Sequence, residues 1–328
     1  MSPPGPHLPP LVQAVAYHRD PLGVLRRARA RYGPVFALRV TKPVTFVADP
    51  AAIDPLVTTT RAGAARRVIL PLASERSLFG SDGDEHRGER ARLEPWFEDI
   101  DRDAIAAIAE EHIAHWPRGT PFRLLERMRA LASDVFARVI LKVTDPPAYV
   151  RAVHRMLNTP GNPPLPVPAS ADPAFRKRAQ PLIELLEREG HDADRLLVVC
   201  AAAQEPPGIA LTNVAYEIAR GTHTSIEDTL RRRPSASAAL RELTEPFSID
   251  GHTLPSGTTV ALPTLLLPQL SPFGGGARRC VGEPLARAQL ETVIPLLPKL
   301  KAVWPRPERM VVRGTVLVPH RSALVELH

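Results

Sequence analysis

Hydrophobic residues recur at helical spacing over much of this chain. They predict amphipathic helices over residues 21–32, 84–97, 124–139, 174–188, 225–232 and 281–297. The most regular stripe, expected to face the core, consists of Leu124, Leu125, Met128, Leu131, Val135 and Val139. Short apolar runs over 35–40 and 44–48 and a hairpin over 247–254 predict strands, and alternation over 311–327 predicts two closing strands. The pattern therefore predicts a mainly α protein with small β elements near both ends.

Proline interrupts this pattern more often than in most proteins. The chain has 37 prolines, about twice the usual share, and proline breaks both helices and strands. A Pro-rich connection is therefore expected at about 158–173. Pro206 and Pro207 should kink or split the long helix expected over 192–220. No repeat and no domain boundary is evident, so residues 1–328 are interpreted as a single domain.

The composition is that of an ordinary globular protein, with 44% hydrophobic and 23% charged residues. The net charge of +7 comes from scattered arginines. We interpret them as solvated residues and expect no nucleic acid partner, although a basic face would suit an acidic redox protein. Two cysteines make no disulfide scaffold, and Cys200, in an apolar run, is expected to be a buried structural thiol. No membrane span and no signal pattern is found, so a cytoplasmic protein is expected.

A glycine-rich loop around Cys280 is the stretch most indicative of chemistry. The three glycines at 274–276 allow the backbone to approach a flat or bulky group closely. Cys280 then precedes a helix, where backbone N–H groups and the helix dipole favour a thiolate. Arg278 adds a positive charge that suits an anionic ligand group. A thiolate held under a flat cofactor is the arrangement that ligates haem iron.

This loop resembles the haem-binding loop of the cytochromes P450. The five fixed positions of that motif are matched by Phe273, Gly276, Arg278, Cys280 and Gly282, and a chance match to all of them is rare. The resemblance implies a shortened, bacterial-type cytochrome P450-like fold that binds haem b, with Cys280 as the axial ligand of the iron. It also places Gly274 among the cofactor-binding residues.

Two further stretches resemble the family less specifically. His86 and Arg90 lie four residues apart on one face of the helix over 84–97, and the resemblance implies that they bind a haem propionate. Arg241 lies in a stretch similar to the strand that supplies another propionate arginine. The alternatives are a solvated helix face for His86 and Arg90 and an ordinary surface arginine for Arg241.

The resemblance is incomplete in the central helix. Glu205 occupies the position of the family's distal acid, but Pro206 replaces the threonine that follows it. Gln204 or Glu205 is therefore the candidate catalytic proton donor, because either side chain can bond a distal water. A salt-bridged or exposed acid is the alternative for Glu205.

Other supports of the family's haem pocket are not found. Residues 234–240 contain no E-x-x-R pair, and Glu217 and Arg220, which match its letters, are interpreted as an accidental match. The stretch from 148 to 194 is short for the helix pair that covers the substrate. The stretch from 263 to 273 is short for the loop that leads to the haem motif. We therefore expect a more open pocket.

The sequence predicts a haem-thiolate oxidoreductase of the monooxygenase or peroxygenase type. The small-molecule substrate would be a hydrophobic or natural-product intermediate. No G-x-G-x-x-G motif follows a strand, so electrons would come from a separate ferredoxin- or flavodoxin-type donor. The missing threonine favours peroxide-driven oxidation or a rearrangement without external electrons. A non-catalytic P450-like scaffold and a haem protein for sensing or storage stay open as alternatives.

Overall fold

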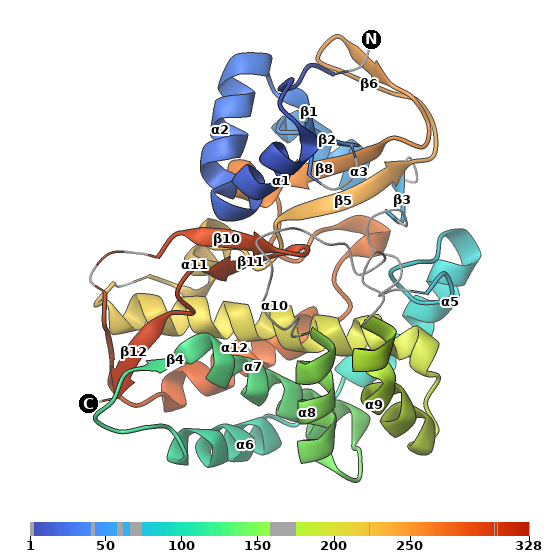
Figure 1. Ribbon diagram of the computed structural model, residues 1–328. Helices are drawn as coiled ribbons and strands as arrows, with labels where there is room; N and C mark the ends of the chain where they lie inside the picture. The colour runs from blue at the N-terminus through green and yellow to red at the C-terminus, as the bar shows by residue number, and fades with distance from the viewer. Residues whose placement is uncertain are drawn as a thin grey trace.

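The computed structural model describes residues 3–40, 43–57, 62–65, 74–157, 175–222, 224–304, 306 and 308–327. Figure 1 shows a smaller β-rich part, which includes the N-terminal helices, above a larger helical part that α10 crosses from end to end. The hairpin of β10 and β11 lies between the two parts. The interpretation of residues 1–328 as a single domain stays a prediction.

The β-rich part is built on a five-stranded sheet of order β1-β2-β8-β5-β3. Its strands are β1 (Val35–Arg39), β2 (Pro43–Val47), β3 (Ala62–Gly63), β5 (Ala238–Leu243) and β8 (Thr259–Pro263). β2 and β8 pair in parallel, and the other neighbours are antiparallel. Helices α1 (Pro10–Arg19) and α2 (Pro21–Tyr32) pack against β1. The order places β5, which carries Arg241, directly beside the edge strand β3.

The helical part surrounds one large apolar core. Its helices are α5 (Gly83–Leu93), α6 (Arg102–Ala114), α7 (Leu124–Val135), α8 (Pro146–Leu157), α9 (Phe175–Arg188), α10 (Ala193–Ala219), α11 (Ile226–Arg232) and α12 (Glu283–Leu296). α7 continues as a π-helix over Phe136–Leu141. α7 and α10 share the most extensive contact between any two elements, so this pair forms the centre of the part.

Shorter elements complete the two parts. They are η1 (Pro50–Ala52), α3 (Ile53–Val57), η2 (Glu94–Phe97), β4 (Phe122–Arg123), β6 (Phe247–Ile249), β7 (His252–Leu254), η5 (Thr264–Leu266), η6 (Gly276–Arg278), β9 (Leu300–Ala302), β10 (Met310–Arg313), β11 (Val316–Pro319) and β12 (Leu324–Leu327). β12 pairs with both β4 and β9, which joins the end of the chain to the start of α7.

Most of the predicted elements are confirmed. α2 ends at Tyr32, where Gly33 takes a φ of 89°. The hairpin of β6 and β7 turns at Asp250 and Gly251, whose φ angles of 47° and 72° suit a two-residue turn. The apolar stripe over 124–139 is buried except at Val139, which is partly buried. Residues 311–327 form three strands, one more than predicted, because β12 leaves the hairpin and joins another sheet.

The central helix is not split at its two prolines. α10 is continuous from Ala193 to Ala219 with Pro206 and Pro207 inside it, so the predicted split is wrong. Proline removes backbone donors and costs helix stability, but most residues of α10 are buried against its neighbours. The Ser235 hydroxyl also donates to the Pro206 carbonyl oxygen at 2.9 Å. Tertiary packing therefore outweighs the local cost of the prolines.

A helix pair is present where the length of the sequence predicted little room for one. α8 and α9 pack against each other, and both contact α10; Figure 1 shows them side by side. Residues 146–157 and 175–188 are helical, and the expectation that this stretch is short for the pair that covers the substrate stays a prediction. The Pro-rich connection at about 158–173 lies outside the described residues. The more open pocket stays a prediction.

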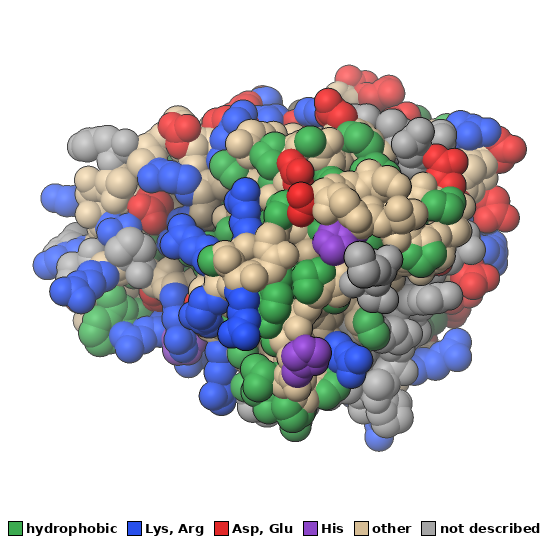
Figure 2. Space-filling model, turned by 90° about the horizontal axis from the view of Figure 1, so that it is seen from above, with side chains coloured by type: hydrophobic (Ala, Val, Ile, Leu, Met, Phe, Trp, Pro, Cys, Tyr) green, Lys and Arg blue, Asp and Glu red, His purple; other side chains and the backbone are tan. Residues whose placement is uncertain are grey.

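The surface of the β-rich part carries both basic and acidic side chains. Figure 2 shows Lys and Arg side chains more often on one side of this face, and Asp and Glu along the opposite rim. α2 contributes exposed arginines at Arg26, Arg27, Arg29 and Arg31. Within the described ranges, no helix combines the length and the apolar character that a membrane crossing needs.

Candidate functional site

The loop before α12 has the compact geometry that its glycines predicted. Gly274 and Gly276 take φ angles of 70° and 60°, which glycine adopts without strain. The Cys280 N–H donates to the Phe273 carbonyl oxygen at 2.9 Å and closes the loop. Gly282 has an ordinary φ of −86°, and a Cβ added there would lie 3.9 Å or more from its neighbours. The loop therefore requires glycine at 274 and 276 but not at 282.

Phe273 anchors this loop to α12. The Arg287 guanidinium lies 4.9 Å from the centroid of the Phe273 ring, and Arg287 pairs with Glu283 at 2.9 Å. The ring also packs against the core of the helical part. The Phe273 end of the loop is thus held against α12 and the core.

Cys280 presents an exposed thiol at the end of the loop. Although the side chain reaches solvent, desolvation by the surrounding protein raises its pKa, and Glu283 adds to this rise. Backbone hydrogen bonds at Gly282 and Glu283 and the charge of Arg90 lower the pKa, but by less. The expected stable thiolate is therefore wrong for the chain alone, because desolvation outweighs the helix terminus. Loss of the thiol proton would have to accompany metal coordination.

Arg278 ties the loop to the start of α5. Its guanidinium donates to the Ser81 carbonyl oxygen at 2.8 Å and forms an ion pair with Asp82. Asp82 stands at the N-cap position of α5 but makes no capping hydrogen bond. Its carboxylate accepts a hydrogen bond from the Arg278 guanidinium instead. It also accepts one from the Ala64 N–H at 2.7 Å. Asp82 therefore links the loop to the strand region around β3.

Arg90 makes a second link between α5 and the loop. Its Nη1 donates to the carbonyl oxygens of Ala277 and Arg279 at 3.3 and 2.6 Å, and its Nε donates to Glu94 at 2.7 Å. The Arg90 side chain is only 22% exposed. The alternative of a solvated helix face therefore does not apply to Arg90.

His86 lies at the centre of the charged groups. Its side chain is buried, and burial lowers its pKa to about 4, with Arg278 and Arg90 as the next causes. Arg241 lowers this pKa further, whereas Asp82 raises it. The imidazole is therefore neutral near pH 7, and the arginines that act on its pKa lie on α5, on β5 and in the Cys280 loop.

This environment predicts an acid-sensitive fold. As the pH falls from 6.5 to about 4, the unfolded chain takes up a proton on His86 that the folded chain does not. The free energy of unfolding should therefore fall through that window, and His86→Gln should reduce the fall. Urea unfolding at neutral pH and across the window measures the difference, with His115→Gln at the end of α6 as the control. An identical pH dependence for wild type and His86→Gln would contradict the prediction.

Arg241 supplies a buried positive charge at the same place. It is 9% exposed, and its guanidinium donates to the Leu240 carbonyl oxygen at 2.9 Å. Among the described residues, no carboxylate lies within ion-pair distance of it. Burial, with the nearby Arg278 as the second cause, lowers its pKa to about 10. A buried arginine without a carboxylate is suited to an anionic ligand, so the alternative of an ordinary surface arginine does not apply.

These residues fit haem as the sequence resemblance implies. The loop offers one sulfur ligand, and Arg241 offers a buried cation for a propionate. The described part of the chain has no group of three or more His, Cys, Asp or Glu side chains able to hold an isolated metal ion. One cysteine sulfur beside a cluster of arginines suits a metal ion that is bound as part of an organic cofactor with anionic groups.

Gln204 and Glu205 lie on α10 and contact α7. The Glu205 carboxylate forms an ion pair with Arg129, and the Gln204 Oε1 accepts from the Ser133 hydroxyl at 3.0 Å. Neither residue is among the groups that shift the pKa of His86 or Cys280. Their role as distal proton donors stays a prediction, and the alternative of a salt-bridged acid describes Glu205 as it stands here.

Glu217 and Arg220 form an ion pair near the end of α10. Arg220 donates to Glu217 at 2.9 Å, and Arg233 lies 3.7 Å from the same carboxylate. Arg233 also donates to the Glu308 carbonyl oxygen at 3.2 Å. The interpretation of Glu217 and Arg220 as an accidental match to E-x-x-R stays a prediction, and Arg233 joins their carboxylate to the segment before β5.

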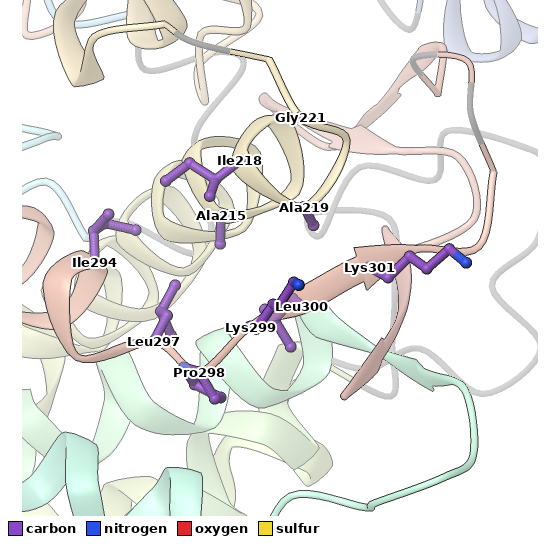
Figure 3. Close-up of a pocket in the computed structure, with 10 residues that line it drawn as sticks. All are labelled: Ala215, Ile218, Ala219, Gly221, Ile294, Leu297, Pro298, Lys299, Leu300 and Lys301. Carbon is purple, nitrogen blue, oxygen red and sulfur yellow. The ribbon is translucent and has the colours of Figure 1, made fainter. Parts of the chain in front are cut away.

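A sizeable cavity lies away from Cys280. It has a volume of about 720 Å³ and is lined by the ends of α10 and α12 and by β9. Figure 3 shows apolar side chains such as Ile218, Ile294 and Leu297 around it, with Lys299 and Lys301 on the neighbouring segment. α12 separates Ile294 from Cys280 by roughly 20 Å at 1.5 Å per residue. The cavity is therefore not part of the Cys280 site.

Sequence reasoning did not single out Asp82. An aspartate directly before a helix usually caps it, and no sequence argument gave Asp82 another role. The basic residues His86, Arg90 and Arg278 could have indicated its role, because a site that gathers them needs a negative charge.

No family model matches the chain, but its sequence is similar to those of several cytochromes P450. The putative cytochromes P450 135B1 and 135A1 of Mycobacterium tuberculosis are each 25% identical to it, over 430 and 433 aligned positions. These alignments cover 99% of this chain and 91% and 95% of the relatives. Since the chain has 328 residues, the relatives contain segments that it lacks. The predicted resemblance to a shortened cytochrome P450 is confirmed.

Solved structures show the same fold. A cyanobacterial CYP120A1 bound to retinoic acid matches with a TM-score of 0.80 at 18% identity, over 100% of this chain and 99% of that one. A 6-coordinated cytochrome P450 from Thermus thermophilus matches with a TM-score of 0.74 at 21% identity, over 94% and 98%. The predicted mainly α, cytochrome P450-like fold is confirmed.

Proposed function

We propose that this chain, which has the cytochrome P450 fold, is a haem-thiolate oxidoreductase acting on a small hydrophobic molecule. The observation that carries the proposal is the convergence of the Cys280 loop with His86, Arg90, Arg241 and Arg278. These residues come from α5, β5 and the loop, which are far apart in sequence. One exposed thiol beside a cluster of partly uncompensated arginines is what a carboxylate-bearing haem requires.

The Cys280 loop would hold the cofactor from the sulfur side. Haem b, when bound, supplies a redox-active iron, and a cysteine thiolate ligand favours O–O cleavage there. The closed loop fixes the thiol before binding, through the hydrogen bond from the Cys280 N–H to Phe273. The backbone hydrogen bonds to the sulfur at Gly282 and Glu283 favour its negative form and would tune it as a ligand once its proton is lost.

The arginines would position the cofactor's carboxylates. Arg241 is buried, with no carboxylate in ion-pair range among the described residues, so a propionate would relieve the cost of burying its charge. Neutral His86 can donate one hydrogen bond to the same group. Arg90 already holds the loop carbonyl oxygens and would act mainly by keeping α5 against the loop.

The proposal is tested by haem reconstitution. The purified full-length chain is titrated with haem, reduced and exposed to carbon monoxide. A difference spectrum with the long-wavelength Soret band of thiolate ligation supports the oxidoreductase. A chain that binds no haem supports the scaffold alternative. Haem binding without that band would show that Cys280 is not the ligand.

The contacts of α10 favour one oxidant, hydrogen peroxide, over molecular oxygen. Pro206 has no hydroxyl, the Glu205 carboxylate is held by Arg129, and the Gln204 amide is held by Ser133. A monooxygenase needs a proton donor for bound oxygen as well as electrons from a separate ferredoxin- or flavodoxin-type protein. Hydrogen peroxide carries, with its oxygen atoms, the two electrons and two protons that a monooxygenase takes from other sources. These contacts favour the peroxygenase form of the proposal.

Pro206→Thr should therefore improve the use of electrons from a donor protein. We expect the share of electrons lost as hydrogen peroxide to fall several-fold, because general acid catalysis by a placed hydroxyl is worth at least that much. Peroxide released per electron pair is measured with a surrogate ferredoxin and its reductase. Pro207→Thr, one residue further along α10, is the matched control. Equal losses in wild type and Pro206→Thr would count against a proton-delivery defect.

A further inference from the structure

Asp82 lies where the elements of the candidate site meet. It directly precedes α5, it accepts a hydrogen bond from Ala64 next to β3, and it pairs with Arg278 in the Cys280 loop. β3 pairs with β5 at Gly63 and Glu242, beside Arg241. One carboxylate thus connects all the segments that carry the proposed haem contacts.

The carboxylate of Asp82 opposes the positive charge of the site. Arg278, Arg90 and Arg241 all lower the pKa of His86, whereas Asp82 raises it. Arg241 and Arg278 also act on each other, since Arg278 lowers the pKa of Arg241. Without a carboxylate, the site would bring these arginines together against their mutual repulsion.

The Asp82 carboxylate also fills a space that the absence of a side chain at Gly63 leaves open. A Cβ on Gly63 would lie 2.7 Å from the Asp82 Oδ1, so glycine at this position leaves the space that the carboxylate fills. The Ala64 N–H and the Arg278 guanidinium donate to the same oxygen. The Asp82 side chain is 37% exposed, whereas that of Arg278 is 16% exposed. Asp82 can therefore be released toward solvent more easily than Arg278.

We propose that Asp82 is an internal stand-in for a haem propionate, and that haem loading exchanges one carboxylate for the other on Arg278. The inference rests on the proposed function and adds to it a residue that controls loading. A propionate carboxylate makes the same kind of charge-assisted bond as aspartate, so Arg278 is paired before and after the exchange. Asp82 then has two effects: it supports the haem-free fold, and it competes with the cofactor.

The experiment compares Asp82→Asn with wild type as full-length, haem-free chains. Titration with haem, followed by Soret absorbance, gives the dissociation constant of each. We expect Asp82→Asn to bind haem about tenfold more tightly, the usual size for one hydrogen bond to a charged group. Urea unfolding of the haem-free chains gives the second readout, in which Asp82→Asn should unfold at lower urea.

Two controls isolate the exchange from a general change of charge. Asp84→Asn removes the same charge two residues further on, where the side chain is 91% exposed and pairs with Arg87; it should match wild type in both measurements. Haem dimethyl ester lacks free carboxylates, so it should bind wild type and Asp82→Asn equally.

The possible outcomes separate this proposal from the proposed function. Equal or weaker haem binding by Asp82→Asn, with wild type binding normally, refutes the exchange alone. An equal gain in affinity for the dimethyl ester also refutes it, because no propionate could then be responsible. A wild-type chain that binds no haem refutes the proposed function and the exchange with it.

Discussion

Cys280→Ser should abolish the long-wavelength Soret band of the reduced, carbon monoxide-treated protein. The substitution removes the sulfur and preserves the size of the side chain, so the closed loop and the arginines stay in place. Haem should still bind, with lower affinity, because under the proposal Arg241 and its neighbours would hold the haem carboxylates and not the iron. The same titration and difference spectrum used for wild type measure both effects. This is the largest expected change, since one atom provides the whole thiolate signature.

The other cysteine provides the control for this experiment. Cys200 is 1% exposed, and burial raises its pKa to about 12. It cannot reach a cofactor in the folded chain, so Cys200→Ser should keep the band even if the protein becomes less stable. Retention of the band in Cys280→Ser would overturn the ligand assignment.

Local pattern was sufficient to predict most helices and strands. The stripe over 124–139 is core, and the turn at Asp250 and Gly251 has the backbone angles that this dipeptide favours. The prediction failed at Pro206 and Pro207, where helix-breaking residues remain inside α10 because their neighbours are buried. Propensity describes an isolated segment, and the packing that overrides it involves residues far away in sequence.

The candidate site was foreseen in part, through the resemblance of its loop to a known motif. The meeting of His86, Arg90 and Arg241 around Arg278 depends on the sheet order and on α5, which no local pattern reveals. The helix-terminus argument gave the wrong direction for the pKa of Cys280. It included the helix dipole but not the desolvation that the folded chain imposes. Electrostatics at this site is a tertiary property.

Gly208→Ala should destabilise the whole protein through the contact between α7 and α10. A Cβ on Gly208 would lie 2.9 Å from both the Cα and the Cγ of Arg129, so the backbone of one helix must move. We expect the free energy of unfolding to fall by about 2 kcal/mol, the usual cost of overpacking a core. The shift would also disturb the ion pair of Arg129 with Glu205. Urea unfolding followed by tryptophan fluorescence measures the loss.

Gly88→Ala is the matched comparison, because it makes the same substitution in the middle of α5. No neighbouring atom lies within 4 Å of a Cβ placed at Gly88. Alanine is favoured over glycine in a helix by up to about 1 kcal/mol, so this variant should be slightly more stable than wild type. The two substitutions should therefore change stability in opposite directions. A gain in stability from Gly208→Ala would mean that α7 and α10 are not in close contact at this point, and the constraint on Glu205 would be lost with it.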